Sequence, residues 1–147
     1  MTIKVISTNI SHEKGTIKES VPRIILNNKG VEGDAHAGDW HRQVSLLAKE
    51  SIEKWGNQAG RKVKWGEFAE NITTEGITLH ETTPGDRLII GDVELEVTQI
   101  GKKCHGKGCA IFKEVGNCVM PKEGIFARVL KHGEVMAGDE MKYLPKS

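Results

Sequence analysis

The chain has 147 residues, of which 21 are lysine or arginine and 20 are aspartate or glutamate, so its net charge is +1. This length is typical of one domain with its own core, and 37% hydrophobic with 28% charged residues argues against disorder. The balanced charge gives no reason to expect nucleic acid as a partner. We expect no membrane partner either, because no apolar run reaches the roughly 20 residues of a membrane-spanning helix.

The first residues and the cysteines predict the cellular compartment. The start, MTIKVISTNISHEKG, has a lone lysine, a short apolar stretch and then charged residues, which is not the pattern of a secretory leader. The three cysteines lie within fifteen residues, at positions 104, 109 and 118. This odd, clustered set does not resemble a secreted disulfide framework, so we predict a cytoplasmic protein.

The first half of the chain has short elements separated by turn residues. We expect strands over Ile3–Ser7 and Arg23–Leu26, the second followed by a turn. The apolar run Val44–Ala48 fits either a buried strand or the first turn of a helix. Lys49–Asn57 has helical spacing, and Gly56 is the expected stop.

The second half gives the clearest β pattern. Arg87–Ile90 and Val93–Ile100 are predicted as a hairpin around a glycine-led turn, and the second of these strands alternates apolar and polar residues. Ile125–Lys131 and Glu140–Leu144 are predicted as further strands. Many short strands, few short helices and 17 glycines predict a mainly β protein, a closed or nearly closed β-barrel.

The strongest candidate for chemistry is the segment that follows the predicted strand ending at Ile100. Cys104 lies there among basic residues, which are Lys102, Lys103, His105 and Lys107. Positive neighbours stabilise a thiolate over a thiol, and a thiolate is both a nucleophile and a ligand for soft metals. The lysines and free backbone amides are also suited to hold a phosphate. The alternative is that Cys104 is a small buried side chain.

A zinc site is the rival use of the same segment. Four possible ligands are present, Cys104, His105, Cys109 and Cys118. Their spacing lacks a Cys-x2-Cys pair and matches no common structural zinc pattern. Cys109 and Cys118 also fit buried structural positions, and a pair of the three cysteines can form a transient redox disulfide.

A second polar segment, Gly33–Val44, contains His36, His41 and Arg42 together with two aspartates. One interpretation is a set of turns in which the aspartates bond their own backbone. Another is a polar rim, with Arg42 as a planar fork for phosphate or carboxylate. A metal site is a third, although the spacing is neither that of a zinc-binding helix nor that of a calcium loop.

A third feature is the adjacent pair Glu70 and Asn71, which interrupts an apolar–polar pattern. Both side chains can satisfy buried backbone groups, and both can read the edge of a heterocycle. No Ser/His/Asp elbow, Walker loop or dinucleotide fingerprint is present in the sequence.

Together these segments show a family resemblance. Its carrying residues are Gly33–His36, His41–Ser45, Glu70–Thr73, Pro84–Leu88, Ile90–Gly91, Cys104 and Met120–Val129. Their order and spacing resemble the MOSC domain family, named for the C-terminal domain of molybdenum cofactor sulfurase. The resemblance covers nearly the whole chain, so we expect a single MOSC-like domain over residues 1–147.

The resemblance implies a barrel that binds the molybdenum–pterin cofactor (molybdopterin) or handles sulfur destined for a metal centre. The family's functional cysteine maps onto Cys104, either as a persulfide carrier or as a molybdenum ligand. The implied cofactor-binding candidates are His36, Arg42, Glu70, Asn71, Lys102, Lys103, His105 and Lys107. Further candidates are Cys109, Cys118, His41 and Arg128.

The chain also departs from larger members of the family. Lys103-Cys104-His105 stands where they have Pro-Cys, and the amino-terminal barrel of the reductase members is not in this sequence. Because it contains no haem, flavin or nicotinamide fingerprint and no pyridoxal phosphate module, we expect a cofactor or sulfur carrier. A cysteine desulfurase-type sulfur donor or a molybdoenzyme acceptor is then the expected partner. The alternatives are a small molybdenum-dependent reductase of N-hydroxylated bases served by an electron-donor partner, and a zinc-stabilised binding module.

Overall fold

The structure is a computed structural model that describes residues 2–13, 17–35, 37–101 and 123–146. The strands are β1 (Ile3–Ile10), β2 (Glu19–Val21), β3 (Arg23–Asn27), β4 (Gly30–Val31), β5 (Val44–Ala48), β6 (Ile72–Glu75), β7 (Arg87–Ile90), β8 (Val93–Ile100), β9 (Ile125–Lys131), β10 (Gly133–Met136) and β11 (Glu140–Leu144). The helical segments are α1 (Lys49–Ala59) and the short 3-10 turn η1 (Leu79–Glu81). Within the described ranges, neither has the length and apolar composition needed to cross a membrane.

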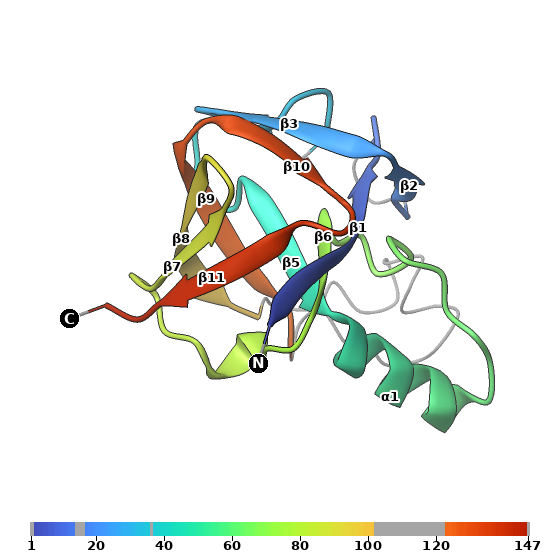
Figure 1. Ribbon diagram of the computed structural model, residues 1–147. Helices are drawn as coiled ribbons and strands as arrows, with labels where there is room; N and C mark the ends of the chain where they lie inside the picture. The colour runs from blue at the N-terminus through green and yellow to red at the C-terminus, as the bar shows by residue number, and fades with distance from the viewer. Residues whose placement is uncertain (1, 14–16, 36, 102–122, 147) are drawn as a thin grey trace.

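Seven strands close into a barrel (Figure 1). Going round, the order is β1, β11, β7, β8, β9, β5 and β6, and β6 pairs again with β1. The ring closes where Ile3 of β1 lies opposite Met141 of β11, and all neighbours are antiparallel except β5 and β6. Closure removes the free edges that an open sheet would expose. The predicted mainly β barrel is therefore confirmed.

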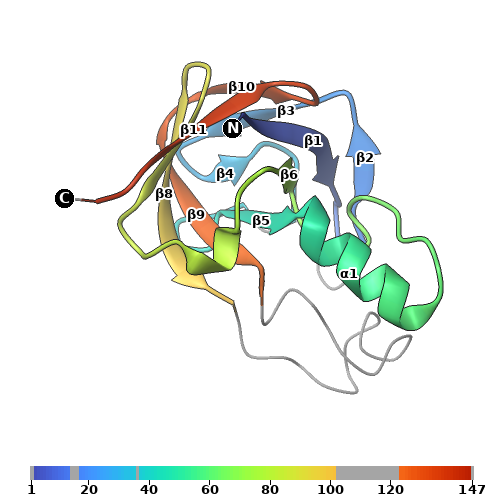
Figure 2. The same ribbon diagram turned by 60° about the horizontal axis from the view of Figure 1, so that its bottom comes forward.

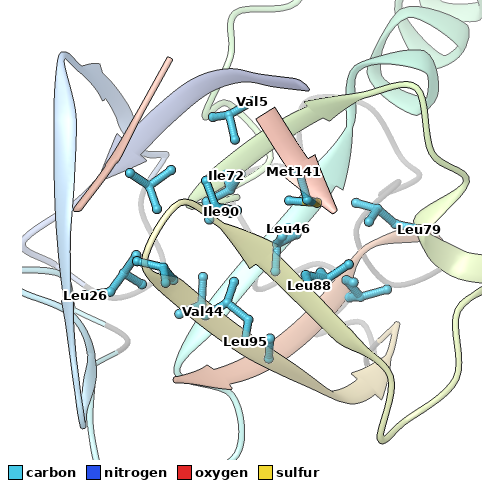
Figure 3. Packing of buried hydrophobic residues seen from close by; sticks show 14 of the residues in the cluster. Val5, Leu26, Val44, Leu46, Ile72, Leu79, Leu88, Ile90, Leu95 and Met141 are labelled. Atoms are coloured by element: carbon cyan, nitrogen blue, oxygen red, sulfur yellow. The ribbon is translucent and has the colours of Figure 1, made fainter. Parts of the chain in front are cut away.

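Apolar side chains fill the barrel (Figure 3). Strand β8 shows why: Val93, Leu95 and Val97 alternate along it and are all buried, as its sequence predicts. The hairpin that joins β7 to β8 turns at Gly91, which has a φ of +59°. Glycine adopts such a positive φ at little cost. The core therefore arises from period-two alternation joined by tight turns.

A three-stranded sheet, β10–β3–β4, lies across the top of the barrel in Figure 1. It contributes Ile24, Leu26, Val31 and Val135 to the same core. On the other face of this sheet, Ile25 is 40% exposed and Met136 is 43% exposed. The sheet thus covers the barrel, with one face buried in the core and the other exposed to solvent.

The run Val44–Ala48, which the sequence leaves open between strand and helix, is strand β5, and all five residues are buried. Helix α1 follows at once and runs beside the barrel (Figure 2). It packs on the outer face of β5 through a second apolar cluster, which consists of Leu47, Ile52, Trp55, Val63, Phe68 and Phe126. The helix therefore extends the core to the outside of the barrel wall.

The predicted helix stop at Gly56 is wrong. The helix continues to Ala59 and ends at Gly60, which has a φ of +72° and donates its N–H to the Gly56 carbonyl. Gly56 is a packing residue instead, because a Cβ there would lie 2.8 Å from the carbonyl oxygen of Arg61. Both glycines serve the helix end, one by close packing and one by its left-handed conformation.

Candidate functional site

The site lies where β8 ends and β9 begins. Ile100 and Ile125 are paired, and the Gly101 N–H donates to the Gly124 carbonyl at 2.6 Å. The chain therefore leaves the barrel wall and returns to it at one point. The predicted residues that lie outside the described ones are His36, Lys102, Lys103, Cys104, His105, Lys107, Cys109 and Cys118.

Two predicted residues, His41 and Arg42, come together beside this point. Both bond the Oε1 atom of Gln99: the Arg42 Nε donates at 3.0 Å, and the His41 Nε2 lies at 2.8 Å. Gln99 in turn donates its Nε2 to the Gly101 carbonyl at 2.7 Å. The segment that precedes β5 is thereby tied directly to the end of β8.

Arg42 is held by two aromatic rings as well as by Gln99. Its guanidinium carbon lies 5.8 Å from the ring centre of Trp40 and 5.5 Å from that of Phe126. Such cation–ring contacts fix the plane of the guanidinium group. Its two terminal nitrogens make no hydrogen bond or ion pair with any described residue. A rigid cation with an unused pair of donors is a receptor for an anion.

The other arginines show that this arrangement is unusual in the molecule. Arg23, Arg61, Arg87 and Arg128 each have a carboxylate partner, which is Glu134, Glu67, Glu94 and Glu96 respectively. Arg128, a predicted site candidate, donates its Nε to Glu96 at 2.6 Å. Within the described residues, Arg42 is thus the one arginine that has no ion pair.

Sequence reasoning missed Gln43, which positions the segment before β5. Its Nε2 donates to the carbonyls of Asn28 and Gly38, at 2.9 and 3.0 Å, and its Oε1 accepts the Val129 N–H at 2.9 Å. Gln43 is buried, so these bonds are shielded from water. They anchor the loop that carries Trp40 and Arg42 to β9.

Asp34 belongs to the scaffold of the second polar segment. It forms an ion pair with Lys18 at 2.8 Å, and both side chains are completely buried. Asp34 also accepts the backbone N–H of Ser11. These bonds run to distant residues and not, as the turn interpretation predicts, to the backbone of Asp34's own segment. The anion-rim interpretation of Arg42 stays a prediction. Lys18 gives no sequence signal, because nothing local distinguishes it from an exposed lysine.

Glu70 is fully buried beside β6. Its Oε2 accepts the Gly66 N–H and the Thr73 hydroxyl, both at 2.9 Å. Its Oε1 has no hydrogen-bond partner among the described residues. Burial raises the pKa of Glu70, although backbone amides around the carboxyl oppose this. Burial therefore favours the protonated form more than water does.

Asn71, the residue before β6, bonds β5 and β1 through its side chain. Its Oδ1 accepts the Ser45 N–H at 3.0 Å, and its Nδ2 donates to the Asn9 carbonyl at 3.2 Å. Asn71 is completely buried. Satisfying buried backbone is thus a role that the structure shows for Asn71. That Glu70 and Asn71 also bind a cofactor stays a prediction.

The metal alternatives lie mainly outside the described residues. Among the residues that are described, no three histidine, cysteine, aspartate or glutamate side chains gather as a metal site requires. His36 and the three cysteines are not among them. The zinc alternative therefore stays a prediction.

The described part of the site combines a cation with an aromatic surface. Arg42 offers unpaired terminal donors, and Trp40, which is 41% exposed, offers an aromatic surface beside them. The cationic segment that contains Cys104 begins one residue beyond Gly101.

Comparison with known proteins places this chain in a family. The model of the MOSC domain matches residues 33–142, a range that includes Arg42, Glu70, Asn71 and Cys104. The chain therefore belongs to the MOSC domain family, as the sequence predicts. This family is associated with the molybdenum cofactor. No curated protein matches the chain.

Solved structures share the fold at low sequence identity. The YuaD protein from Bacillus subtilis is 17% identical, with a TM-score of 0.83 over 100% of this chain and 98% of its own. YiiM from Geobacillus stearothermophilus is 21% identical, with a TM-score of 0.77 over 97% of this chain and 75% of its own. YiiM from Escherichia coli is 22% identical, with a TM-score of 0.67 over 100% and 71%. At these identities the likeness shows the fold alone.

Proposed function

We propose that this protein binds the molybdenum cofactor and that Cys104 either accepts sulfane sulfur or ligates molybdenum. One observation carries the proposal: Arg42 is fixed with unpaired donors beside the point where the Cys104 segment leaves the barrel. Membership of the MOSC family supports the cofactor part of the proposal. The protein then acts as a carrier, with a cysteine desulfurase-type donor or a molybdoenzyme acceptor as partner.

Arg42 is the proposed phosphate-binding residue. A guanidinium group keeps its charge at any physiological pH, and its paired N–H groups match two phosphate oxygens. Gln99 holds the Nε edge, so the opposite edge faces the ligand. Little side-chain entropy is lost on binding, because the rings of Trp40 and Phe126 already restrict the group. Lys102, Lys103 and Lys107 are proposed to add positive charge, and His36 and His105 are proposed as further polar contacts.

Cys104 is the proposed reactive residue. Three peptide units separate it from Gly101, so its Cα lies within about 11 Å of the Gly101 Cα. Basic neighbours in the sequence favour its thiolate. In sulfur transfer the thiolate attacks the terminal sulfur of a donor persulfide, the donor S–S bond breaks, and the donor leaves as a thiolate. A new S–S bond forms at Cys104, and no external oxidant is needed.

The bound cofactor would supply a molybdenum centre that accepts a sulfur ligand. The chain's own contribution is to hold the phosphate at Arg42 and to present a soft thiolate ligand. Glu70 and Asn71 support the site through the barrel wall, because Asn71 fixes the start of β5 three residues after Arg42. Cys109, Cys118, His41 and Arg128 have no assigned step in this proposal.

The proposal is tested on protein purified without oxygen from cells that make the cofactor. Wild type is expected to contain molybdenum and pterin and to take up a persulfide label. Cys104→Ser should lose the label, and Arg42→Gln should lose the pterin while keeping the label. The matched control is Arg87→Gln, because Arg87 of β7 is paired with Glu94 of β8. This variant should retain both the pterin and the persulfide label.

Two results would defeat the assigned roles. Equal cofactor content and equal labelling in Cys104→Ser would remove the cysteine from the proposal. Equal pterin retention in Arg42→Gln and Arg87→Gln would remove Arg42, because both substitutions delete one positive charge.

A further inference from the structure

Among the described residues, strand β2 has a neighbouring strand on one side only. It pairs with β1, and it stands outside the closed ring of seven strands (Figures 1 and 2). A strand in this position can expose backbone groups that pair with another chain. Whether β2 exposes such groups depends on the direction in which its backbone N–H and C=O groups point.

Ser20 directs its backbone N–H and C=O away from the barrel. Its partner across β1 is Asn9, and both backbone groups of Asn9 point the other way: the Asn9 N–H donates to Asn71, and its carbonyl accepts the Asn71 side chain. In antiparallel sheets such a pair exchanges no backbone bonds, and both residues point outward. Ser20 therefore presents one backbone donor and one backbone acceptor at the outer edge, and neither bonds another described residue.

A groove follows this edge. It starts where the Lys18 N–H donates to the Gly66 carbonyl at 2.9 Å, and from there residues 62–65 form the opposite wall. Its volume is about 640 Å³, and its lining includes Ile17, Ser20, Val63 and Trp65. Ile17 is 48% exposed. The groove thus combines an open strand edge with an apolar wall.

The unpaired charges at this groove are mostly positive. Lys62 and Lys64 are exposed, and neither forms an ion pair with a described residue. The Glu67 carboxylate in the same lining is already paired with Arg61. Glu19 is the remaining acidic residue in the lining of this groove. It also lines a second cavity of about 460 Å³ that contains Val21 and Ile10. The wall that faces Ser20 is therefore suited to acidic side chains.

We propose that this groove binds a short extended peptide segment of a partner protein, in which apolar and acidic residues alternate. The segment adds a strand to β2 through the N–H and C=O of Ser20, which is the pairing used in β-strand addition. Its apolar side chains pack on Val63 and Trp65, and its carboxylates lie near Lys62 and Lys64. Because β2 has three residues and Pro22 ends it, the segment is short and the complex transient. The inference does not depend on the proposed cofactor function.

The test uses the full-length protein labelled with nitrogen-15 and a blocked six-residue peptide of alternating valine and glutamate. Amide shifts are expected in residues 17–21 and 62–67, with at least tenfold slower hydrogen exchange at Ser20. A peptide with an N-methyl group on a central valine should bind at least tenfold more weakly, because it loses a backbone donor. Lys62→Glu and Lys64→Glu should each weaken binding at least threefold. Lys142→Glu, an exposed lysine of β11, should have no effect.

Three outcomes would overturn the inference. The first is a valine–lysine peptide that binds as tightly as the glutamate peptide. The second is a set of amide shifts outside the two named ranges. The third is a dimer that forms without peptide and is broken by Lys64→Glu, since a second copy would then occupy the edge.

Discussion

Replacing Asn71 by alanine separates its role in the fold from a role in ligand binding. The Ser45 N–H and the Asn9 C=O are both buried, and the Asn71 side chain bonds each of them. Alanine leaves both groups without that partner. A buried polar group without a partner costs about 1–3 kcal/mol, so we expect a loss of about 2–6 kcal/mol. This is a large fraction of the roughly 5–15 kcal/mol that stabilises an ordinary domain.

The loss is measured as the free energy of unfolding in urea and as the melting temperature. At about 2–4 °C per kcal/mol for a chain of this size, the melting temperature should fall by at least roughly 5 °C. Asn57→Ala is the matched control, because Asn57 is exposed on α1 and no side-chain hydrogen bond is found for it among the described residues. It should change stability by less than about 0.5 kcal/mol. Wild-type stability in Asn71→Ala, together with lost cofactor binding, would refute the bracing role and make Asn71 a ligand residue.

Three further predictions concern buried or paired charges. Glu70→Gln should gain stability relative to wild type as pH rises above about 4.5. The reason is that the raised pKa makes native Glu70 hold a proton that the unfolded chain releases. The same difference in free energy of unfolding between the two proteins at pH 4 and at pH 8, measured in urea, would contradict this. Lys18→Met should cost about 3–5 kcal/mol, because the buried Asp34 carboxylate loses the charge of Lys18. Adding Asp34→Leu should recover part of the loss in the same assay, because it removes the buried charge but also the acceptor of the Ser11 N–H. Glu123→Ala should cost about 1 kcal/mol, because its carboxylate accepts the Ser51 hydroxyl and the Lys54 ammonium of α1; an unchanged urea midpoint would count against it.

The strands that could be predicted from the sequence are those whose signal is local. The structure has Arg87–Ile90, Val93–Ile100, Ile125–Lys131 and Glu140–Leu144 at the predicted bounds, because alternation and glycine turns define them without reference to distant partners. The short strands β2, β4 and β6 are different. Ile72–Glu75, for example, is a strand because β1 and β5 flank it, and no four-residue pattern contains that information.

The same distinction applies to the site. Arg42 could be proposed as an anion-binding residue from its chemistry, because only arginine offers a planar fork of donors. That Arg42 is held in place could not be predicted from the sequence, because Gln99 is 57 residues away and Phe126 is on another strand. Gln43 and Lys18 were missed for the same reason: a buried glutamine or lysine has the same local sequence signal as an exposed one.

The polar residues of the family resemblance divide into two groups by burial. Asp34, Gln43, Glu70 and Asn71 are buried, and their bonds hold the loops and strands around the start of β5. Arg42 lies next to these residues, but none of their side chains bonds its guanidinium group. Because Gln43 follows Arg42 directly and Asn71 bonds Ser45 three residues on, the buried group and Arg42 have linked roles. The buried group fixes the backbone from which Arg42 is proposed to bind an anion.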